Sequence, residues 1–405
     1  MLWWICFFNY ADRQAIFSVF PLLEKEFGLT LAQLGWLGSS FGLVYGLCAP
    51  LAGRVVDRVR RKSAILAGLH TWSAITILTA LSRGFGQLLT FRAAEGLGET
   101  FYIPASMSLI SDYHGKPTRS RALGFHQTSV YVGTIAGGYF AGLVGQNYGW
   151  RWSFVVFGGL GILLGMVLRR YLVEPERGAA DRTAAAGTGR NAYPTFWRTP
   201  TVLILLAAFL CANFVAVVVL TWMPKFLYDK FHLSLAAAGL TATVFIQLAS
   251  MAGSPVGGWL ADRWRARRPG GRMMVQAAGL LCGAPFVVLC GETRSIGWLI
   301  VALTAWGFFK GLYDANIFAS VFDVVPAEAR GSAAGLMNMV GWLGGGGAAP
   351  VAIGYLAERE GLSAAISMTA AVYVMGGALL IAGIAMFVTR DVRRMETAVE
   401  RAREA

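Results

Sequence analysis

The chain has 405 residues, of which 56 % are hydrophobic and only 14 % are charged, and its mean hydropathy is +0.55. Soluble globular proteins carry about 25 % charged residues, so this composition excludes an ordinary soluble domain and indicates a membrane protein. The net charge is +13, which is compatible with a nucleic-acid partner until the positions of the basic residues are considered. The five cysteines lie scattered without metal-ligand spacing, and we expect no disulfide framework, no metal site and no cofactor.

Twelve apolar stretches follow one another along the chain, and each is long enough to cross a bilayer as an α-helix. They cover residues 2–21, 32–53, 63–82, 85–111, 122–145, 151–172, 201–224, 233–260, 273–291, 295–321, 331–357 and 363–389.

The basic residues alternate between the two sides of these spans. The loops after every second span and the C-terminal tail hold 25 of the 35 Lys and Arg residues, and the opposite loops hold seven. The remaining three, Arg13, Arg92 and Lys310, lie inside spans. By the positive-inside rule we expect both termini on the cytoplasmic side of a plasma (inner) membrane. The basic charge is therefore a topology signal, which excludes a nucleic-acid partner.

Seven ionisable side chains interrupt the apolar spans. A charge near the bilayer centre costs about 2.5–3.5 kcal/mol on insertion scales, so such residues normally face a bundle interior or a water-filled path. Three cations and four carboxylates together indicate a site that holds an anion and handles protons. The seven residues are Asp12, Arg13, Arg92, Glu95, Glu99, Lys310 and Asp314.

Spacing limits how these groups can pair. Arg92, Glu95 and Glu99 are spaced i, i+3 and i+7 and share one helical face. Arg92 can therefore pair with Glu95, which leaves Glu99 to titrate, or the whole set can be a buried structural ion pair. Lys310 and Asp314 are spaced i, i+4, so they can pair with each other or face a substrate.

Further polar residues lie near these charges or alone on apolar spans. Tyr313 and Asn316 offer hydrogen-bonding groups beside Lys310 that a polyol or sugar acid could use. The lone polar residues are either ligand contacts or interhelical hydrogen bonds. They are Tyr45, Gln127, Asn213 and Asn338.

The loop at 173–200 is a polar linker that divides the chain. We predict a six-helix bundle over 1–172, a cytoplasmic linker over 173–200, a second six-helix bundle over 201–390 and a cytoplasmic tail over 391–405.

The two halves repeat each other, as in transporters built from parallel six-helix repeats. The segment from Pro50 to Arg58 recurs from Pro255 to Arg263 at an offset of 205 residues. Further pairs occur at an offset of 211, namely Gly96 with Gly307, Asp112 with Asp323, Arg119 with Arg330 and Gly124 with Gly335.

The segment Gly53-x-x-x-Asp57-Arg58-x-Arg60-Arg61-Lys62 resembles the signature loop between helices 2 and 3 of the major facilitator superfamily, although Arg60 stands where that family usually has glycine. The resemblance implies an all-α membrane protein with twelve transmembrane helices in two pseudo-symmetric six-helix bundles. At the helix ends we expect a gate latch, for which the alternative is plain positive-inside decoration. The candidate gating residues are Asp57, Arg58, Arg61, Asp262 and Arg263.

A finer resemblance is to the anion:cation symporter family. Asn9-Tyr-Ala-Asp12-Arg13 resembles its pattern in helix 1, and Arg92-x-x-x-Gly96-x-Gly98-Glu99-x-x-x-x-Pro104 resembles its pattern in helix 4. The resemblance implies that Asp12 is a proton site and that Arg13 contacts the substrate anion. The pair of Lys310 and Asp314 departs from this pattern and leaves the substrate open.

These observations predict a secondary active transporter that imports a small organic anion, such as a sugar acid or other carboxylate, with protons by alternating access. We assign proton coupling to Asp12, Glu95 and Glu99. Substrate binding is assigned to Arg13, Arg92, Tyr45, Gln127, Asn213, Lys310, Tyr313, Asp314, Asn316 and Asn338. The expected partners are the organic anion, protons and the lipid bilayer, and we expect a monomer.

Two alternatives are weighed against symport. The spinster family of lipid exporters, which move lysolipids or sphingolipids with protons, shares Asn-Tyr-x-Asp-Arg and the Arg-to-Glu spacing. Pro104 at its position favours the symporter family instead. An enzyme would require a nucleophile or a metal cluster, and the sequence has neither signature.

Overall fold

A computed structural model describes residues 1–176, 197–326 and 329–404. Within these ranges every regular element is a helix, and no strand is present. This agrees with the predicted all-α class, because a helix satisfies its own backbone hydrogen bonds in lipid. Most of the predicted linker at 173–200 lies outside the described residues.

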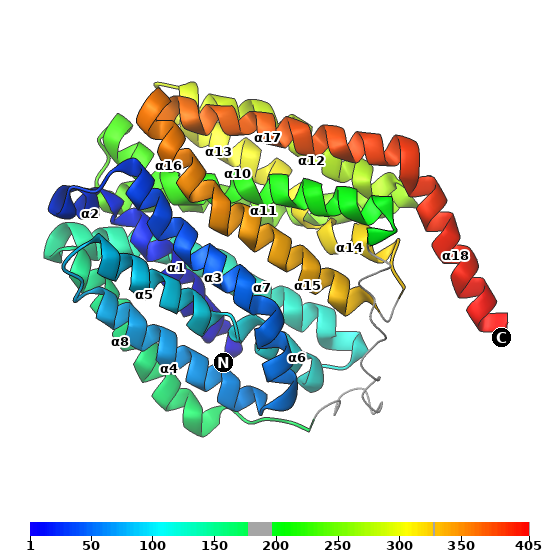
Figure 1. Ribbon diagram of the computed structural model, residues 1–405, viewed down its shortest axis with the longest axis horizontal. Coiled ribbons are helices and arrows are strands. Elements are labelled where there is room, and N and C mark those ends of the chain that lie inside the picture. The colour runs from blue at the N-terminus through cyan, green and yellow to red at the C-terminus, as the bar shows by residue number, and fades with distance from the viewer. Residues whose placement is uncertain (177–196, 327–328, 405) are drawn as a thin grey trace. The chain divides into compact units, whose positions relative to one another are not determined.

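The first half of the chain follows the predicted spans, with two of them broken into shorter helices (Figure 1). The helix that contains Asp12 gives way at Val19 to a second one with proline in its first turn, and the helix that contains Glu99 ends at that residue. The helices are α1 (Leu2–Ser18), α2 (Phe20–Phe27), α3 (Leu31–Arg58), α4 (Arg61–Thr79), α5 (Phe85–Glu99), α6 (Tyr102–Tyr113), α7 (Lys116–Tyr148) and α8 (Trp150–Tyr171).

In the second half, the glycine-rich stretch of the eleventh span winds as a π-helix, and the twelfth span contains another short π-helical stretch. The elements are α10 (Pro200–Phe231), α11 (Leu235–Arg265), α12 (Gly271–Glu292), α13 (Ile296–Asp314), α14 (Ile317–Phe322), α15 (Arg330–Gly341), η2 (Trp342–Ala348), α16 (Ala349–Glu360), α17 (Leu362–Gly383), η3 (Ile384–Val388) and α18 (Thr389–Glu404).

Among the described residues, eight helical stretches are long and apolar enough by themselves to cross a membrane. The other four predicted spans correspond to α1 with α2, to α4, to α5 with α6, and to α7. These are broken, or they carry more polar and charged residues than the rest. Together the two sets make the twelve transmembrane helices of the predicted fold.

By packing, the chain divides into two compact units. Unit 1 runs through Met1–Gly187, Val218–Val244 and Gly346–Arg359. Unit 2 runs through Thr188–Val217, Phe245–Gly345 and Glu360–Ala405. Unit 1 therefore combines the first half of the chain with parts of α10 and α11, the end of η2 and nearly all of α16.

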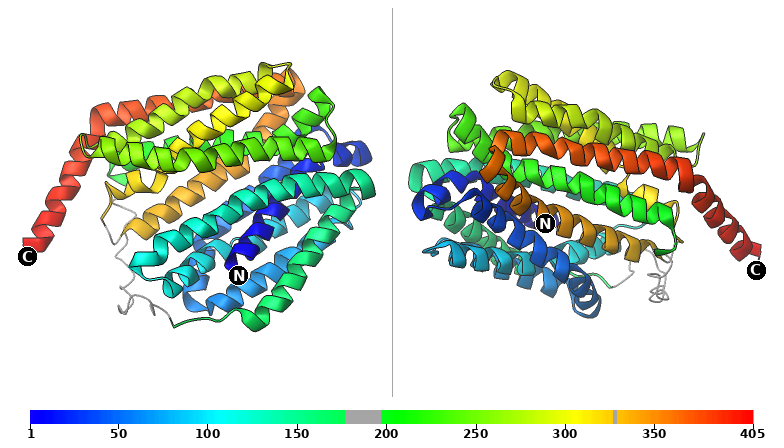
Figure 2. Two further views of the ribbon diagram at one scale, coloured as in Figure 1. Left: turned by 180° about the vertical axis from the view of Figure 1, so that it is seen from behind. Right: turned by 45° about the horizontal axis from the view of Figure 1, so that its top comes forward.

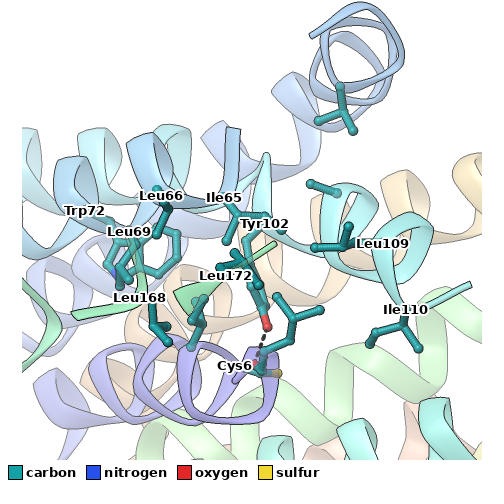
Figure 3. Packing of buried hydrophobic residues seen from close by; sticks show 14 residues of the cluster. Cys6, Ile65, Leu66, Leu69, Trp72, Tyr102, Leu109, Ile110, Leu168 and Leu172 are labelled. Atoms are coloured by element: carbon teal, nitrogen blue, oxygen red, sulfur yellow. Dashed lines mark hydrogen bonds between the residues drawn. The ribbon is translucent and has the colours of Figure 1, made fainter. Parts of the chain in front are cut away.

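The apolar core of unit 1 gathers side chains from α1, α4, α6 and α8 (Figure 3). Trp72 and Tyr102 are fully buried there and meet edge to face with their ring centroids 5.9 Å apart. The Tyr102 hydroxyl donates to the carbonyl of Leu2 at 2.8 Å, which ties the first turn of α1 to α6. Buried aromatic rings with a satisfied polar tip hold these four helices in place.

Glycines let the helices of unit 1 approach backbone to backbone. On α5, a Cβ at Gly96 would lie 2.6 Å from the carbonyl oxygen of Phe41 on α3. On α7, a Cβ at Gly137 would lie 2.6 Å from the Cα of Ala11 on α1. The left view of Figure 2 shows α1 beside α7, against which it packs along its length. Such close approach brings the charged residues of α1 and α5 within reach of their neighbours.

At one end of unit 1, the segments of α10 and α16 are tied to the first half by polar contacts. Lys225 pairs with Glu24 and with Asp229, the latter at 2.8 Å. The Glu358 carboxylate accepts a hydrogen bond from the backbone N–H of Ala32 at 2.8 Å, in the first turn of α3. These contacts satisfy groups at helix ends that lack partners within their own helix.

Unit 2 has its own core, in which α12 packs against α13 and α17. The rings of Trp306 and Tyr373 lie 6.3 Å apart between α13 and α17. The Asp391 carboxylate accepts from the Thr201 backbone N–H at 3.2 Å and from its hydroxyl at 2.8 Å. These contacts join the start of α10 to α18.

The close approach of α1 and α7 predicts that Gly137→Ala lowers the melting temperature of the purified protein, because the added methyl would force the helices apart. Overpacking of this kind costs about 1–3 kcal/mol. The matched control is Gly159→Ala on α8, where a Cβ would meet no atom within 4 Å. Equal melting temperatures for both variants would contradict close packing at Gly137.

Candidate functional site

The five ionisable side chains of the first-half spans lie on α1 and α5 and are buried inside unit 1. Each of them is at most 6 % exposed. Charges that are buried this deeply in a membrane protein require partners or a function. The five residues are Asp12, Arg13, Arg92, Glu95 and Glu99.

One ion pair lies along α5. Arg92 Nη1 donates to Glu95 Oε2 at 2.6 Å, which is the pair that the i, i+3 spacing allows. Thr76 donates its hydroxyl hydrogen to Glu95 Oε1 at 3.3 Å, so α4 also contacts this carboxylate. Arg92 Nη2 donates to the backbone carbonyl of Arg13 at 3.0 Å. The pair on α5 is thereby connected to α1.

A second ion pair crosses from α1 to α5. The Arg13 guanidinium donates through Nε to Glu99 Oε2, and both side chains are buried. The sequence analysis left Glu99 to titrate without a fixed partner, whereas in the structure it is held by Arg13. The two residues are 86 positions apart in the sequence, so helical spacing alone does not reveal their pairing.

Aromatic rings surround the two guanidinium groups. Arg13 Cζ lies 4.7 Å from the centroid of the Tyr10 ring, 4.9 Å from that of Phe41 and 4.8 Å from that of Tyr45. Arg92 Cζ lies 4.7 Å from the same Phe41 centroid. A desolvated cation over an aromatic face gains about 2 kcal/mol. Tyr45 thus packs against Arg13, and its contact with substrate stays a prediction. The rings of Tyr10 and Phe41 were not singled out.

Asp12 has a different environment from the other two carboxylates. It is 1 % exposed, and neither of its oxygens has a hydrogen-bond partner among the described residues. Asn9, one turn earlier on α1, is also buried with both amide atoms unpartnered in the described part of the chain. Asp12 thus differs from Glu95 and Glu99, which are each paired with an arginine.

The other lone polar residues do not join the charged cluster. Gln127 and Asn338 are exposed. Asn213 donates its side-chain amide to the carbonyl of Phe209 on its own helix at 3.1 Å. Their assignment to substrate binding stays a prediction.

In unit 2, Lys310 and Asp314 pair with each other at the end of α13, with side chains 16 % and 28 % exposed. The buried Asn316 follows where the helix breaks, and its amide donates to the carbonyls of Gly257 at 3.2 Å and Leu312 at 3.0 Å. Asn316 is thus used to join α11 to α13. At the repeat offset of 211, Lys310 occupies the position that Glu99 has in the first half.

An arginine in each half makes ion pairs at the helix ends where the gate latch was predicted, and these two groups of ion pairs are called the latch below. In unit 1, the buried Arg61 starts α4 and pairs with Asp112 on α6. Arg61 Nε also lies 3.3 Å from Glu174 Oε1, and Glu174 accepts from the backbone N–H groups of Arg61 at 2.8 Å and Lys62 at 3.2 Å. Glu174 therefore caps α4 after the chain has left α8.

In unit 2, Arg272 starts α12 at the position that corresponds to Arg61 in the repeat of 211 residues. Its guanidinium pairs with Asp323 at 2.6 Å and with Asp262 at 3.0 Å. Arg265 also lies 3.4 Å from Asp323. The two halves thus repeat the same arginine–aspartate contact, although the residues around it differ.

The latch contains only part of the predicted gating set. Arg61 and Asp262 take part, whereas Arg58 and Arg263 are exposed at the helix ends, and the Asp57 side chain lies outside the described residues. The sequence analysis missed Glu174 and Arg272. The repeat would have revealed Arg272, because it lies 211 residues after Arg61.

A family model described as Major Facilitator Superfamily matches residues 2–350 and 272–405. The chain belongs to this superfamily. Within the described residues, no group of three or more His, Cys, Asp or Glu side chains is placed to hold a metal ion.

Three curated relatives are similar over most of the chain. A probable anion transporter of rice chloroplasts (Oryza sativa subsp. japonica) is 27 % identical over 92 % of this chain, which spans 66 % of that protein. The D-galactonate transporter of Escherichia coli is 24 % identical over 91 % of this chain and 90 % of its own length. Protein spinster of Drosophila melanogaster is 27 % identical over 87 % of this chain, which spans 61 % of that protein.

A solved structure supports the fold. The inward-facing, occupied crystal structure of a bacterial homologue of the human lysosomal transporter Spinster has a TM-score of 0.83. It is 22 % identical, and the match covers 96 % of both chains. The protein described here is thus a multi-pass major facilitator transporter, and it is not an enzyme.

The latch of this major facilitator protein predicts a pH-dependent contribution from Glu174. Burial by itself raises the pKa of this carboxyl, but hydrogen bonds from the backbone N–H groups of Arg61 and Lys62 and the Arg61 guanidinium outweigh burial and lower it. A lowered pKa in the folded state stabilises the protein above the ordinary pKa of glutamate, and the gain is lost as the pH falls through the lowered value.

We therefore expect Glu174→Gln to lower the melting temperature at neutral pH, and the difference from wild type to shrink between about pH 5 and pH 3. The matched control is Glu176→Gln, an exposed glutamate of the same loop, which should leave the melting temperature unchanged throughout. A Glu174→Gln difference that does not depend on pH would contradict the capping role.

For the pair on α13, we predict that Lys310→Ala and Asp314→Ala each impair transport, because removing one residue takes the ion-pair partner from a partly buried charge. The double substitution should restore the melting temperature but not the native order of preference among competing substrates. Competition assays in proteoliposomes measure this order. Full recovery of both properties in the double variant would make the pair a scaffold element only.

Proposed function

We propose that this transporter carries a small organic anion, such as a sugar acid or other carboxylate, together with protons by alternating access. The observation that carries the proposal is the arrangement in unit 1, where Arg13 and Arg92 lie over one Phe41 ring and each pairs with a glutamate. An arginine guanidinium can exchange a glutamate carboxylate for a substrate carboxylate, because its planar fork of N–H donors matches both groups.

The exchange of partners supplies a route to proton coupling. When a substrate carboxylate takes the Arg13 guanidinium, Glu99 loses its cation in a buried place. An ionised carboxylate without a partner is costly there, so Glu99 takes up a proton as the substrate binds. Release of the substrate returns Arg13 to Glu99 and frees the proton. Binding of the anion and of the proton thus favour each other.

Asp12 is the proposed binding site of a second proton. Its oxygens are buried and have no hydrogen-bond partner among the described residues, so its neutral form is the cheaper one at this position. If two protons accompany a monoanion, one net positive charge moves inward per cycle. That movement is worth about 2.3 kcal/mol per 100 mV, or on the order of 50-fold accumulation.

The relatives add support for the substrate class, since one is a probable anion transporter and another a D-galactonate transporter. The second candidate is proton-coupled export of a lysolipid or sphingolipid, favoured by the 27 % identity to protein spinster and by the shared residues of α1. A sugar acid needs polar groups around its hydroxyls, whereas a lipid needs an apolar path for its chain.

The distribution of Lys and Arg supports a plasma (inner) membrane with both termini cytoplasmic. The internal repeat supports two six-helix bundles, 1–172 and 201–390, that move against each other. We propose that the functional unit is a monomer.

The experiment uses the purified protein in liposomes and the substitution Glu99→Gln. With D-galactonate as the first probe, followed by a panel of hexuronates, dicarboxylates and lysolipids, we expect loss of proton-driven accumulation while counterflow between equilibrated compartments persists. Counterflow needs only binding and the conformational change, whereas accumulation needs the titrating carboxyl. The matched control is Glu360→Gln, an exposed glutamate at the end of α16, which should retain both activities.

Three outcomes would contradict the proposal. Loss of counterflow together with accumulation, in a protein that keeps its melting temperature, would make Glu99 a binding or structural residue. Wild-type accumulation in Glu99→Gln would place proton coupling elsewhere. Accumulation of lysolipids but of none of the carboxylates would favour the spinster-like function.

A further inference from the structure

A polar groove lies on α4 beside the end of α8, within unit 1 (α4 and α8 are neighbours in Figure 1). Its volume is about 620 Å³. On α4 it is lined by Lys62, Ser63, His70 and Thr71, and on α8 by Arg169. None of these residues belongs to the charged cluster of α1 and α5.

The polar lining is unusual for a span that faces lipid. The α4 residues of the groove recur every four positions, so they form one stripe along the helix. Ser63 and Thr71 are exposed on the surface of the unit, where hydrocarbon offers no hydrogen-bond partner. These polar residues lower the mean hydropathy of α4. For this reason α4 is not among the eight described stretches that are apolar enough by themselves to cross a membrane.

The groove is positively charged. Lys62 and Arg169 lie on its rim from two different helices, and its lining contains no Asp or Glu. The nearest latch carboxylates, Asp112 and Glu174, are bound to Arg61. The positive-inside pattern assigns this end of α4 to the cytoplasmic side, where the leaflet carries anionic lipids.

The His70 ring is held in a fixed place in the groove. Its Nδ1 donates to the carbonyl of Leu66, one turn earlier on α4, at 2.7 Å. The ring packs against Gly165 of α8, where a Cβ would lie 2.6 Å from a ring carbon. Arg169 follows Gly165 by one helical turn and so shares its face of α8. The small residue thereby places an imidazole and a guanidinium side by side along the groove.

We propose that this groove binds the phosphate headgroup of an anionic phospholipid from the adjoining leaflet. Lys62 and Arg169 contact the phosphate from either side, and the hydroxyls of Ser63 and Thr71 donate to phosphate and ester oxygens. Leu66 and Ala67 also line the groove and offer apolar surface to the start of an acyl chain. That apolar surface and the position on the side of a span favour a lipid over free phosphate.

The test uses the full chain in dodecylmaltoside, with dioleoylphosphatidylglycerol as the probe. We expect a saturable rise in melting temperature and a lipid adduct that survives in native mass spectrometry. Dioleoylphosphatidylcholine and inorganic phosphate at the same concentration should produce neither. Since each basic residue near an anionic surface contributes about fivefold in affinity, the double variant Lys62→Gln/Arg169→Gln should bind the lipid on the order of 30-fold more weakly.

The matched control is Arg267→Gln/Arg268→Gln, which removes two exposed arginines from the loop after α11, on the same predicted side of the membrane. An equal loss in this control would show general attraction to charge and would overturn the site. Equal stabilisation by inorganic phosphate would identify a free-anion site instead. A second variant, Ser63→Ala/Thr71→Val, keeps the charge and should weaken the lipid several-fold, and wild-type binding in both groove variants would overturn the proposal.

Discussion

The cost of burying charge in an apolar medium governs the rest of this structure. Unit 1 holds two arginines and three carboxylates away from water, and a charge without a partner there would cost several kcal/mol. The Arg13–Glu99 pair meets this constraint by joining α1 to α5, and Arg92 adds a hydrogen bond to the Arg13 carbonyl. Close packing of the neighbouring helices accompanies these pairs, with Gly96 of α5 against α3 and Gly137 of α7 against α1.

The same constraint operates at the ends of the helices. Arg61 begins α4 and Arg272 lies in the first turn of α12, and each is paired with an aspartate from elsewhere in the same unit. The additional capping by Glu174 draws the start of the linker to α4 in unit 1. The contact is common to both halves, but the groups that reinforce it are not. The two halves thus share the arginine–aspartate contact but differ in the polar groups around it.

The functional consequence depends on how each charge is paired. Arg92 and Glu95 lie on one helix and are further held by Thr76, so they remain neighbours whatever the other helices do. Arg13 and Glu99 lie on separate helices, and in the proposed function a substrate carboxylate comes between them. This difference makes the pair between helices the better candidate for exchange with an anion. Asp12, whose oxygens have no hydrogen-bond partner among the described residues, is the proposed site of a second proton.

Local interactions were predictable from the sequence. The twelve spans follow from runs of apolar residues, and the pairs Arg92–Glu95 and Lys310–Asp314 follow from helical periodicity, because residues three or four positions apart lie on the same face. The repeat of 211 residues also related Asp112 to Asp323, which the structure shows in equivalent contacts.

The contacts between distant segments were decided only by the tertiary structure. They include the pairing of Arg13 with Glu99, the Phe41 ring between the two arginines, and the capping of α4 by Glu174. The sequence determined which residues are charged and which helix carries them. The packing of α1, α3 and α5 determined which of them meet, since a partner on another helix depends on helix rotation and separation, and residue spacing along one chain specifies neither.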